Sequence, residues 1–149
     1  MALSNSAESD FLKLLFDNTT WAGVGDATGL VGSTAAGSLY ISLHTGTLTG
    51  TSDQTTSEAT YTGYARVAVS RSAGSWTISG SSPTSIANTS AITFGACTAG
   101  SSTVTYFAVG KSSSGTGEIL FYGALTASLA ISAGITPQFA ASALSCSVL

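Results

Sequence analysis

His44 is the only histidine in this 149-residue chain, so any Ser-His-Asp or Cys-His catalytic arrangement would have to use it. It lies at the end of an apolar-alternating stretch, a position where a catalytic side chain can sit. However, the chain contains no G-x-S-x-G nucleophile elbow, and neither of its two cysteines has recognisable active-site surroundings. We therefore expect His44 to be a hydrogen-bonded structural residue, and we expect no catalytic residues and no enzyme activity.

Carboxylates are the other candidates for acid-base chemistry. Asp53 and Glu58 form the one local pair outside the N-terminal region, and both lie in a polar loop, residues 46–62. A glycosidase needs two carboxylates held about 5–10 Å apart in a cleft, and a loop holds such a pair poorly. Hydrolase activity is therefore not expected. Weak calcium binding by the Asp53 loop, or glycan binding by residues 46–62, stays open.

Cys97 and Cys146 match no zinc-binding spacing, and a single histidine cannot complete such a site. We therefore expect no metal and no other cofactor. Both cysteines lie in stretches that alternate apolar and polar residues, which favours buried free thiols over a disulfide. The sequence leaves open whether the two are paired.

Four aromatic residues near expected loops could form a sugar-binding platform. The alternative is that they pack in the core or in an interface, and we favour it because large aromatic rings dominate the energetics of both. The four residues are Trp21, Tyr61, Tyr64 and Trp76.

The composition limits the classes of partner. Only 7% of the residues are charged, against about 25% in ordinary soluble domains, and the net charge is −3. Four scattered cations do not make a nucleic-acid-binding surface, and no apolar run reaches the ~18–20 residues that span a bilayer. We therefore expect neither a nucleic acid nor a membrane as partner. A surface with few charges suits a subunit of an assembly, although a neutral free protein would look the same.

A short helix is predicted from Ser4 to Phe16. Asn5 is a candidate N-cap, with Glu8 at capping-box spacing. Apolar residues that recur at three- and four-residue steps predict one apolar face. This face could cover an end of the β domain or dock on a neighbouring subunit. Its residues are Leu3, Ala7, Phe11, Leu14 and Leu15.

After the helix, residues 17–37 are rich in Gly, Ala and Thr and predict an extended arm, with Trp21 among its apolar anchors. The remainder predicts short strands separated by turns. Their spacing of roughly 8–12 residues is typical of a sandwich or barrel. The expected strands are Ser38–Thr45, Tyr64–Ser70, Ser75–Ser79, Ser90–Phe94, Thr103–Gly110, Glu118–Leu125, Ser128–Ser132, Thr136–Ala140 and Leu144–Val148.

We therefore predict an all-β fold, an antiparallel, jelly-roll-like β-sandwich with a short N-terminal α-helix. The predicted division is residues 1–37 as helix and arm and residues 38–149 as the sandwich domain.

Several sequence blocks, in order, resemble a family of small tailed-bacteriophage proteins that are labelled tail-fibre-like or generic structural proteins. The resemblance implies a virion component, and the absence of a signal peptide predicts synthesis in the host cytoplasm. The blocks are LSNSAESDFLKLLF, LYISLHTG, YTGYARVAVSR, AITFGACT, VTYFAVG and ILFYGALTASLAISAGITPQFAASAL.

This resemblance leaves three roles. A capsid decoration (cement) protein that binds the lattice of the major capsid protein is the first, because the chain shows no heptads or fibre repeats and has an apolar arm. A tail or tail-fibre component involved in host attachment is the alternative, and a free carbohydrate-binding module or enzyme is the third. Capsid symmetry suggests a homotrimer. The expected partner-binding residues are Leu3, Phe11, Leu15 and Trp21.

Overall fold

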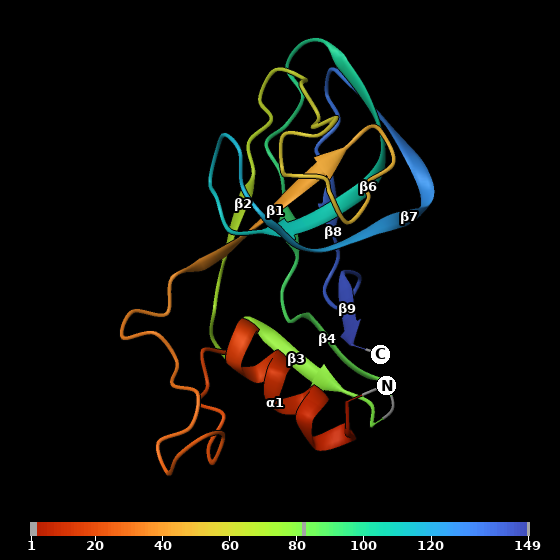
Figure 1. The fold of residues 1–149 in the computed structure, drawn as a ribbon. Coiled ribbons are helices and arrows are strands. Elements are labelled where there is room, and N and C mark those ends of the chain that lie inside the picture. The colour runs from red at the N-terminus through yellow and green to blue at the C-terminus, as the bar shows by residue number, and fades with distance from the viewer. Residues whose placement is uncertain (1–2, 82, 149) are drawn as a thin grey trace. The chain divides into compact units, whose positions relative to one another are not determined.

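The computed structural model describes residues 3–81 and 83–148, and it confirms the predicted fold class (Figure 1). The chain is mostly β, with antiparallel strands in open sheets as expected of a sandwich, and one short helix lies near the N-terminus. The described elements are α1 (Asn5–Phe16), β1 (Ser38–His44), β2 (Val67–Ser70), β3 (Trp76–Ser79), β4 (Thr84–Asn88), β5 (Ile92–Thr93), β6 (Ser101–Gly110), β7 (Ile119–Ser132), β8 (Gln138–Phe139) and β9 (Ser145–Val148).

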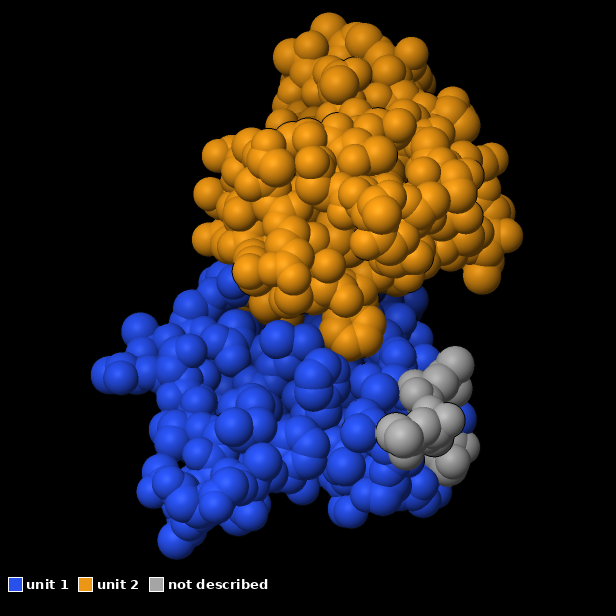
Figure 2. All heavy atoms as spheres, viewed as in Figure 1, with its two compact units in different colours: residues 1–38, 70–91, 139–149 blue, residues 39–69, 92–138 orange. Residues whose placement is uncertain are grey.

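The strands form a four-stranded sheet of order β2-β1-β6-β7, a three-stranded sheet of order β3-β4-β9, and the pair β5-β8. The pairings of β1 with β6, β6 with β7, β3 with β4 and β4 with β9 are antiparallel. The chain divides into two compact units (Figure 2). Unit 1 comprises residues 1–38, 70–91 and 139–149, and unit 2 comprises residues 39–69 and 92–138. The predicted division at residue 37 stays a prediction.

In unit 1, α1 packs on β3 and β4. Its first turn is capped by Ser4, whose side chain accepts a hydrogen bond from the backbone N–H of Ala7. The predicted cap at Asn5 is therefore wrong by one residue. Glu8 does not close a capping box, because its carboxylate instead accepts the backbone N–H of Thr84 at 2.9 Å.

The buried side of α1 also differs from the predicted apolar face. Glu8, Leu12 and Phe16 are buried at four-residue steps, whereas Phe11 is 36% exposed. The hydrogen bond of Glu8 to β4 turns this stripe inward. Phe16 then contacts the buried Trp76 in an edge-to-face geometry, with ring centroids 4.8 Å apart.

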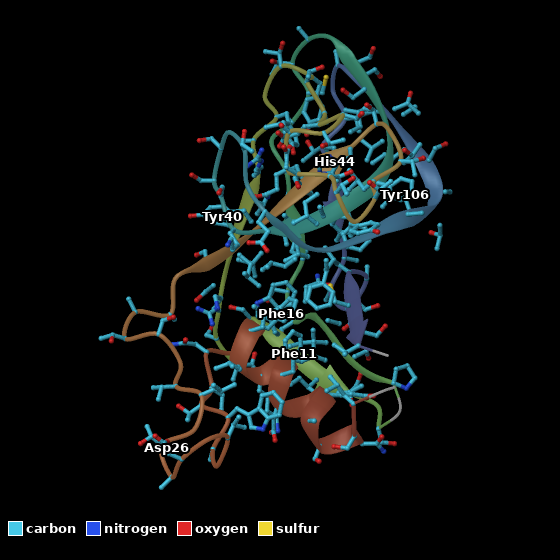
Figure 3. The ribbon with its side chains drawn as sticks, viewed as in Figure 1. Phe11, Phe16, Asp26, Tyr40, His44 and Tyr106 are labelled. Carbon is cyan, nitrogen blue, oxygen red and sulfur yellow. The ribbon has the colours of Figure 1, made fainter. Side chains whose placement is uncertain are left out.

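The segment after α1 is a closed loop, not the extended arm that we predicted. The side-chain amide of Asn18 donates to the carbonyl of Ser33 and its oxygen accepts the Ser33 N–H, at 2.8 and 2.7 Å. Trp21 and Leu30 exchange two backbone hydrogen bonds further along. Asp26 marks the tip of this loop in Figure 3. These hydrogen bonds join residue 18 to residue 33 and residue 21 to residue 30, so the segment folds back on itself.

Arg71 ties the loop to the helix within unit 1. Its guanidinium donates to the carbonyls of Leu14 and Leu15 at 2.8 and 2.6 Å and to the carbonyl of Ala36 at 3.1 Å. The last carbonyls of a helix lack intrahelical partners and carry partial negative charge, so a cation here is favourable. Arg71 therefore fixes both ends of the segment between α1 and β1.

The predicted strands differ from the structure in two places. β4 was missed, because Pro83 was interpreted as a break. The two strands predicted over 118–132 form one strand, β7, whose pairing with β6 is interrupted: Val104 pairs with Leu129, but Tyr106 pairs with Ala124. Four residues of β7 thus stand opposite one residue of β6, which is a bulge.

Candidate functional site

A partly buried polar cluster in unit 2 contains most of the residues that could have done chemistry. We define the polar cluster as Ser42, His44, Glu58, Tyr64 and Arg66. Ser42 and His44 come from β1, which is the second strand of the four-stranded sheet and is buried on both faces from Ile41 to His44. His44 is labelled at the end of this strand in Figure 3. The alternation in the sequence places Ser42 and His44 on the face of β1 opposite its apolar residues, and in the structure this second face is also covered.

His44 makes a hydrogen bond with each of its ring nitrogens. Nδ1 lies 2.8 Å from the carbonyl oxygen of Thr56, which can only accept, so Nδ1 carries a proton. Nε2 lies 2.9 Å from Oγ of Ser42, and in the neutral ring it accepts the hydroxyl proton. Burial lowers the pKa of His44, so the neutral ring is favoured.

The Ser42–His44 pair has the arrangement of a nucleophile and base but lacks the other requirements of catalysis. Ser42 and His44 are both 0% exposed, so no substrate reaches the hydroxyl. The third member is the carbonyl of Thr56 and not a carboxylate. The geometry agrees with the predicted role of His44 as a hydrogen-bonded structural residue.

Glu58 and Arg66 form a bidentate ion pair. Nε and Nη2 of Arg66 lie 2.7 and 2.8 Å from the two carboxylate oxygens, and the Arg66 side chain is only 2% exposed. Tyr64 donates its hydroxyl proton to Glu58 at 2.8 Å and accepts the backbone N–H of Leu43. Burial raises the pKa of Tyr64, so the phenol stays protonated. Glu58 is thus committed to Arg66 and Tyr64.

Asp53 does not join Glu58 as an acid-base pair. Its carboxylate accepts hydrogen bonds from the backbone N–H and the hydroxyl of Thr55, at 2.8 and 2.6 Å, in a local turn. These bonds lower its pKa. Within residues 3–81 and 83–148, no group of three or more His, Cys, Asp or Glu side chains could hold a metal ion.

Hydrogen bonds from both backbone and side chains hold the loop of residues 46–62 in place. Gln54 is fully buried, donates to the carbonyl of Tyr40 and accepts the backbone N–H of Ser112. Arg66 donates to the carbonyls of Ser112 and Gly115 at 3.0 and 2.8 Å. The polar cluster and Gln54 therefore hold two loops, residues 46–58 and 111–117, in one fixed arrangement.

The four aromatic residues do not form a sugar platform. Tyr61 and Trp76 are buried, at 3% and 2% exposed, so neither ring is available to stack on a sugar. Tyr61 contacts Tyr64 edge-to-face, and Tyr64 stacks on Phe94. This packing agrees with the core interpretation for the buried rings.

Both cysteines are buried and free, as expected. Burial raises the pKa of the Cys146 thiol to about 12, which makes it a poor nucleophile. Among the described residues, no helix has the length and apolar character needed to cross a bilayer.

The predicted partner-binding residues lie in unit 1 with different exposures. Leu3 and Phe11 are 42% and 36% exposed, while Leu15 and Trp21 are half-buried. The loop that follows α1 adds three exposed apolar residues that the sequence pattern indicated as anchors of the arm but that were not among the predicted partner-binding residues. These are Val24, Leu30 and Val31.

Comparison with known proteins gives one family. A family model described as Podophage GP4 fiber I protein gp80 matches residues 2–147, nearly the whole chain. No curated protein matches this sequence.

Proposed function

Because the chain belongs to the Podophage GP4 fiber I protein gp80 family, and is thus a bacteriophage structural protein, we propose that it is a subunit of the tail fibre that takes part in host attachment. The match over residues 2–147 carries this proposal and favours the tail-fibre alternative over capsid decoration, which the sequence analysis placed first. The proposed role is non-enzymatic and is performed in the assembled virion.

The fastened loops of unit 2 support a role in contact with a host surface. A rigid loop binds without the entropic cost of ordering it first. Residues 46–58 and 111–117 are held by Gln54 and Arg66, and their exposed side chains are mainly hydroxyl-bearing. Such a surface suits hydrogen bonding to a polar host ligand.

The N-terminal residues support attachment to a neighbouring virion protein. Leu3 and Phe11 are large apolar side chains that unit 1 leaves exposed. Leu15 on α1 and Trp21 on the loop that follows it are half-buried. Because Leu3 and Phe11 are already partly covered, burying the rest of each against a partner is worth roughly 0.5–1 kcal/mol per side chain. We propose that these residues dock on the partner that anchors the fibre.

Immunogold labelling of intact phage with an antibody to the purified protein tests this function. A fibre subunit places the gold on the tail, and its copy number per particle is in the tens or fewer. Gold spread over the head, with hundreds of copies per particle, would overturn the proposal and restore capsid decoration. An excess of free protein should also reduce adsorption of the phage to its host, whereas an unrelated β protein should not.

A further inference from the structure

The ring of His44 lies where β1 meets the 46–58 loop, at the end of the strand (Figure 3). Its Nδ1 donates a hydrogen bond to the carbonyl of Thr56 within the loop, and His44 and Glu58 form an isolated antiparallel bridge at the end of the loop. His44 is fully buried, so water reaches its ring only when the structure around it moves. This junction therefore links the charge of one titratable ring to the position of the loop.

The hydrogen bonds of the ring fit its neutral form. Nε2 accepts the hydroxyl proton of Ser42, and in the described part of the chain this hydroxyl has no other hydrogen-bond partner. A proton on Nε2 would make it a donor, so the Ser42 hydroxyl would have to accept instead. The proton of that hydroxyl would then lack an acceptor in a buried site, which is unfavourable.

The charges near the ring do not offset a buried imidazolium. Glu58 and Asp53 favour the charged ring and Arg66 opposes it. However, Glu58 already holds the Arg66 guanidinium in a bidentate pair, and the Asp53 carboxylate is bound in its own turn. Burial outweighs these effects and lowers the pKa of His44. The titratable and charged groups around the ring are Asp53 and Glu58 of the loop, Tyr64 and Arg66 of the segment that follows it, and Tyr106 of β6, which pairs with His44.

We propose that mild acid loosens the 46–58 loop, because uptake of a proton by His44 favours a state in which the loop has moved aside and water surrounds the imidazolium. Near neutral pH the uncharged ring keeps the loop in place, and the surface that it shares with residues 111–117 stays fixed. The inference rests on the proposed function for one consequence only, that contact with a host ligand weakens in acid. The loosening itself is a property of the purified chain.

The size of the response follows from the ordinary pKa of histidine, which is 6.5. A ring that water reaches in the open state takes up a proton near this pH, whereas the covered ring does so only at a lower pH. The ratio of open to closed loop should therefore rise by up to about tenfold between pH 7.5 and pH 5.5.

Amide hydrogen exchange of the purified full chain, followed by NMR at pH 7.5 and 5.5 and corrected for the intrinsic pH dependence of exchange, tests the proposal. The reporters are the backbone amides of Thr45 and Ala59, which donate hydrogen bonds across the junction at 2.8 and 2.9 Å. Their protection should fall by up to about tenfold at the lower pH. Amides in the ladder between β6 and β7 should keep their protection.

Two variants assign the response to one side chain. His44→Asn takes up no proton in this pH range and should remove the response of Thr45 and Ala59. Asp53→Asn is the matched control, because it removes another titratable group of the same loop and keeps an acceptor oxygen for Thr55. It should respond as the unmodified protein does. The circular dichroism spectrum of each variant checks that it folds.

The unmodified protein gives a readout that does not depend on the variants. His44 is the only histidine, so its ring signals report its protonation without ambiguity. The loss of protection at Thr45 and Ala59 should follow the protonation of this ring. A ring that becomes protonated while both amides keep their protection would overturn the proposal.

Three other results would also overturn it. The first is equal protection of the two reporter amides at both pH values. The second is a loss that extends equally to the β6–β7 ladder, because the sheet would then unfold as a whole. The third is a response that persists in His44→Asn. None of these results depends on where the protein lies in the virion, which the immunogold labelling tests separately.

Discussion

Replacing Arg66 with Met should destabilise unit 2 strongly. The Arg66 side chain is 2% exposed, and its guanidinium makes two hydrogen bonds to Glu58 and two to carbonyls of the 111–117 loop. Met keeps much of the volume but leaves the Glu58 carboxylate without its cation. Removing one partner of a buried ion pair costs about 3–5 kcal/mol. Because the Glu58 side chain is 19% exposed, water solvates part of the orphaned charge, and we expect a loss of about 3 kcal/mol, at the low end of that range.

Lys111→Met is the matched control for this prediction. Lys111 also forms an ion pair, with Glu118, but the two side chains are 56% and 64% exposed. Exposed pairs contribute at most about 1 kcal/mol and frequently nothing measurable. Its loss should therefore be several times smaller than that of Arg66→Met.

Urea unfolding followed by far-ultraviolet circular dichroism measures both variants. Tryptophan fluorescence adds a second signal that is specific for unit 1, because Trp21 and Trp76 both lie there. Arg66→Met should lower the stability seen by circular dichroism. Hydrogen exchange should localise the loosening to residues 46–58 and 111–117. Equal losses for Arg66→Met and Lys111→Met would refute the reasoning, because they would mean that burial adds nothing to the Arg66 pair.

Three further predictions follow from the buried groups and the turns. Burial lowers the pKa of His44 below its ordinary value of 6.5, so near this pH the unfolded chain binds a proton at His44 more readily than the folded chain does. The free energy of unfolding should therefore fall as the pH drops from 7.5 to 5.5, and His44→Asn should reduce this pH dependence. Glu8→Ala should cost about 1–3 kcal/mol in urea unfolding because it orphans the buried N–H of Thr84, whereas Glu8→Gln, which keeps an acceptor oxygen, should cost less. Gly63→Ala should lower the melting temperature far more than Gly115→Ala: both have positive φ, but a Cβ at Gly63 would lie 2.2 Å from a backbone oxygen, whereas Gly115 faces open space.

Local patterns in the sequence predicted the elements that follow a simple period. The α1 helix and the β6–β7 hairpin around residues 111–117 lie where periodicity and Gly-rich turns placed them. The missed strand β4 has the burial pattern of an alternating strand, but two of its buried positions are the polar residues Thr84 and Asn88. Asn88 is satisfied by the carbonyl of Ala140 and the N–H of Leu144, more than fifty residues away. No local signal reveals such partners.

The candidate site shows the same limit. The spacing of Asp53 and Glu58 suggested a carboxylate pair, but Glu58 is bound by Arg66 and Asp53 by its own turn. Gln54 gave no sequence signal at all, although it is fully buried and holds two loops together. A polar side chain in a Ser/Thr-rich loop looks exposed unless its distant partner is known. The roles of Glu58 and Gln54 therefore depend on hydrogen bonds to residues distant in the sequence, which local patterns do not reveal.

The division of the chain into units has a consequence for its biosynthesis. Unit 1 draws on the first 38 residues, on residues 70–91 and on residues 139–149, and β9 pairs with β4. During synthesis, α1 leaves the ribosome long before residues 139–149, which belong to the same unit. Until Trp76 and β9 have been synthesised, Leu12 and Phe16 lack part of the structure that surrounds them in the complete unit 1. Premature termination near residue 138 would thus leave a chain whose beginning, and not merely its end, is incomplete.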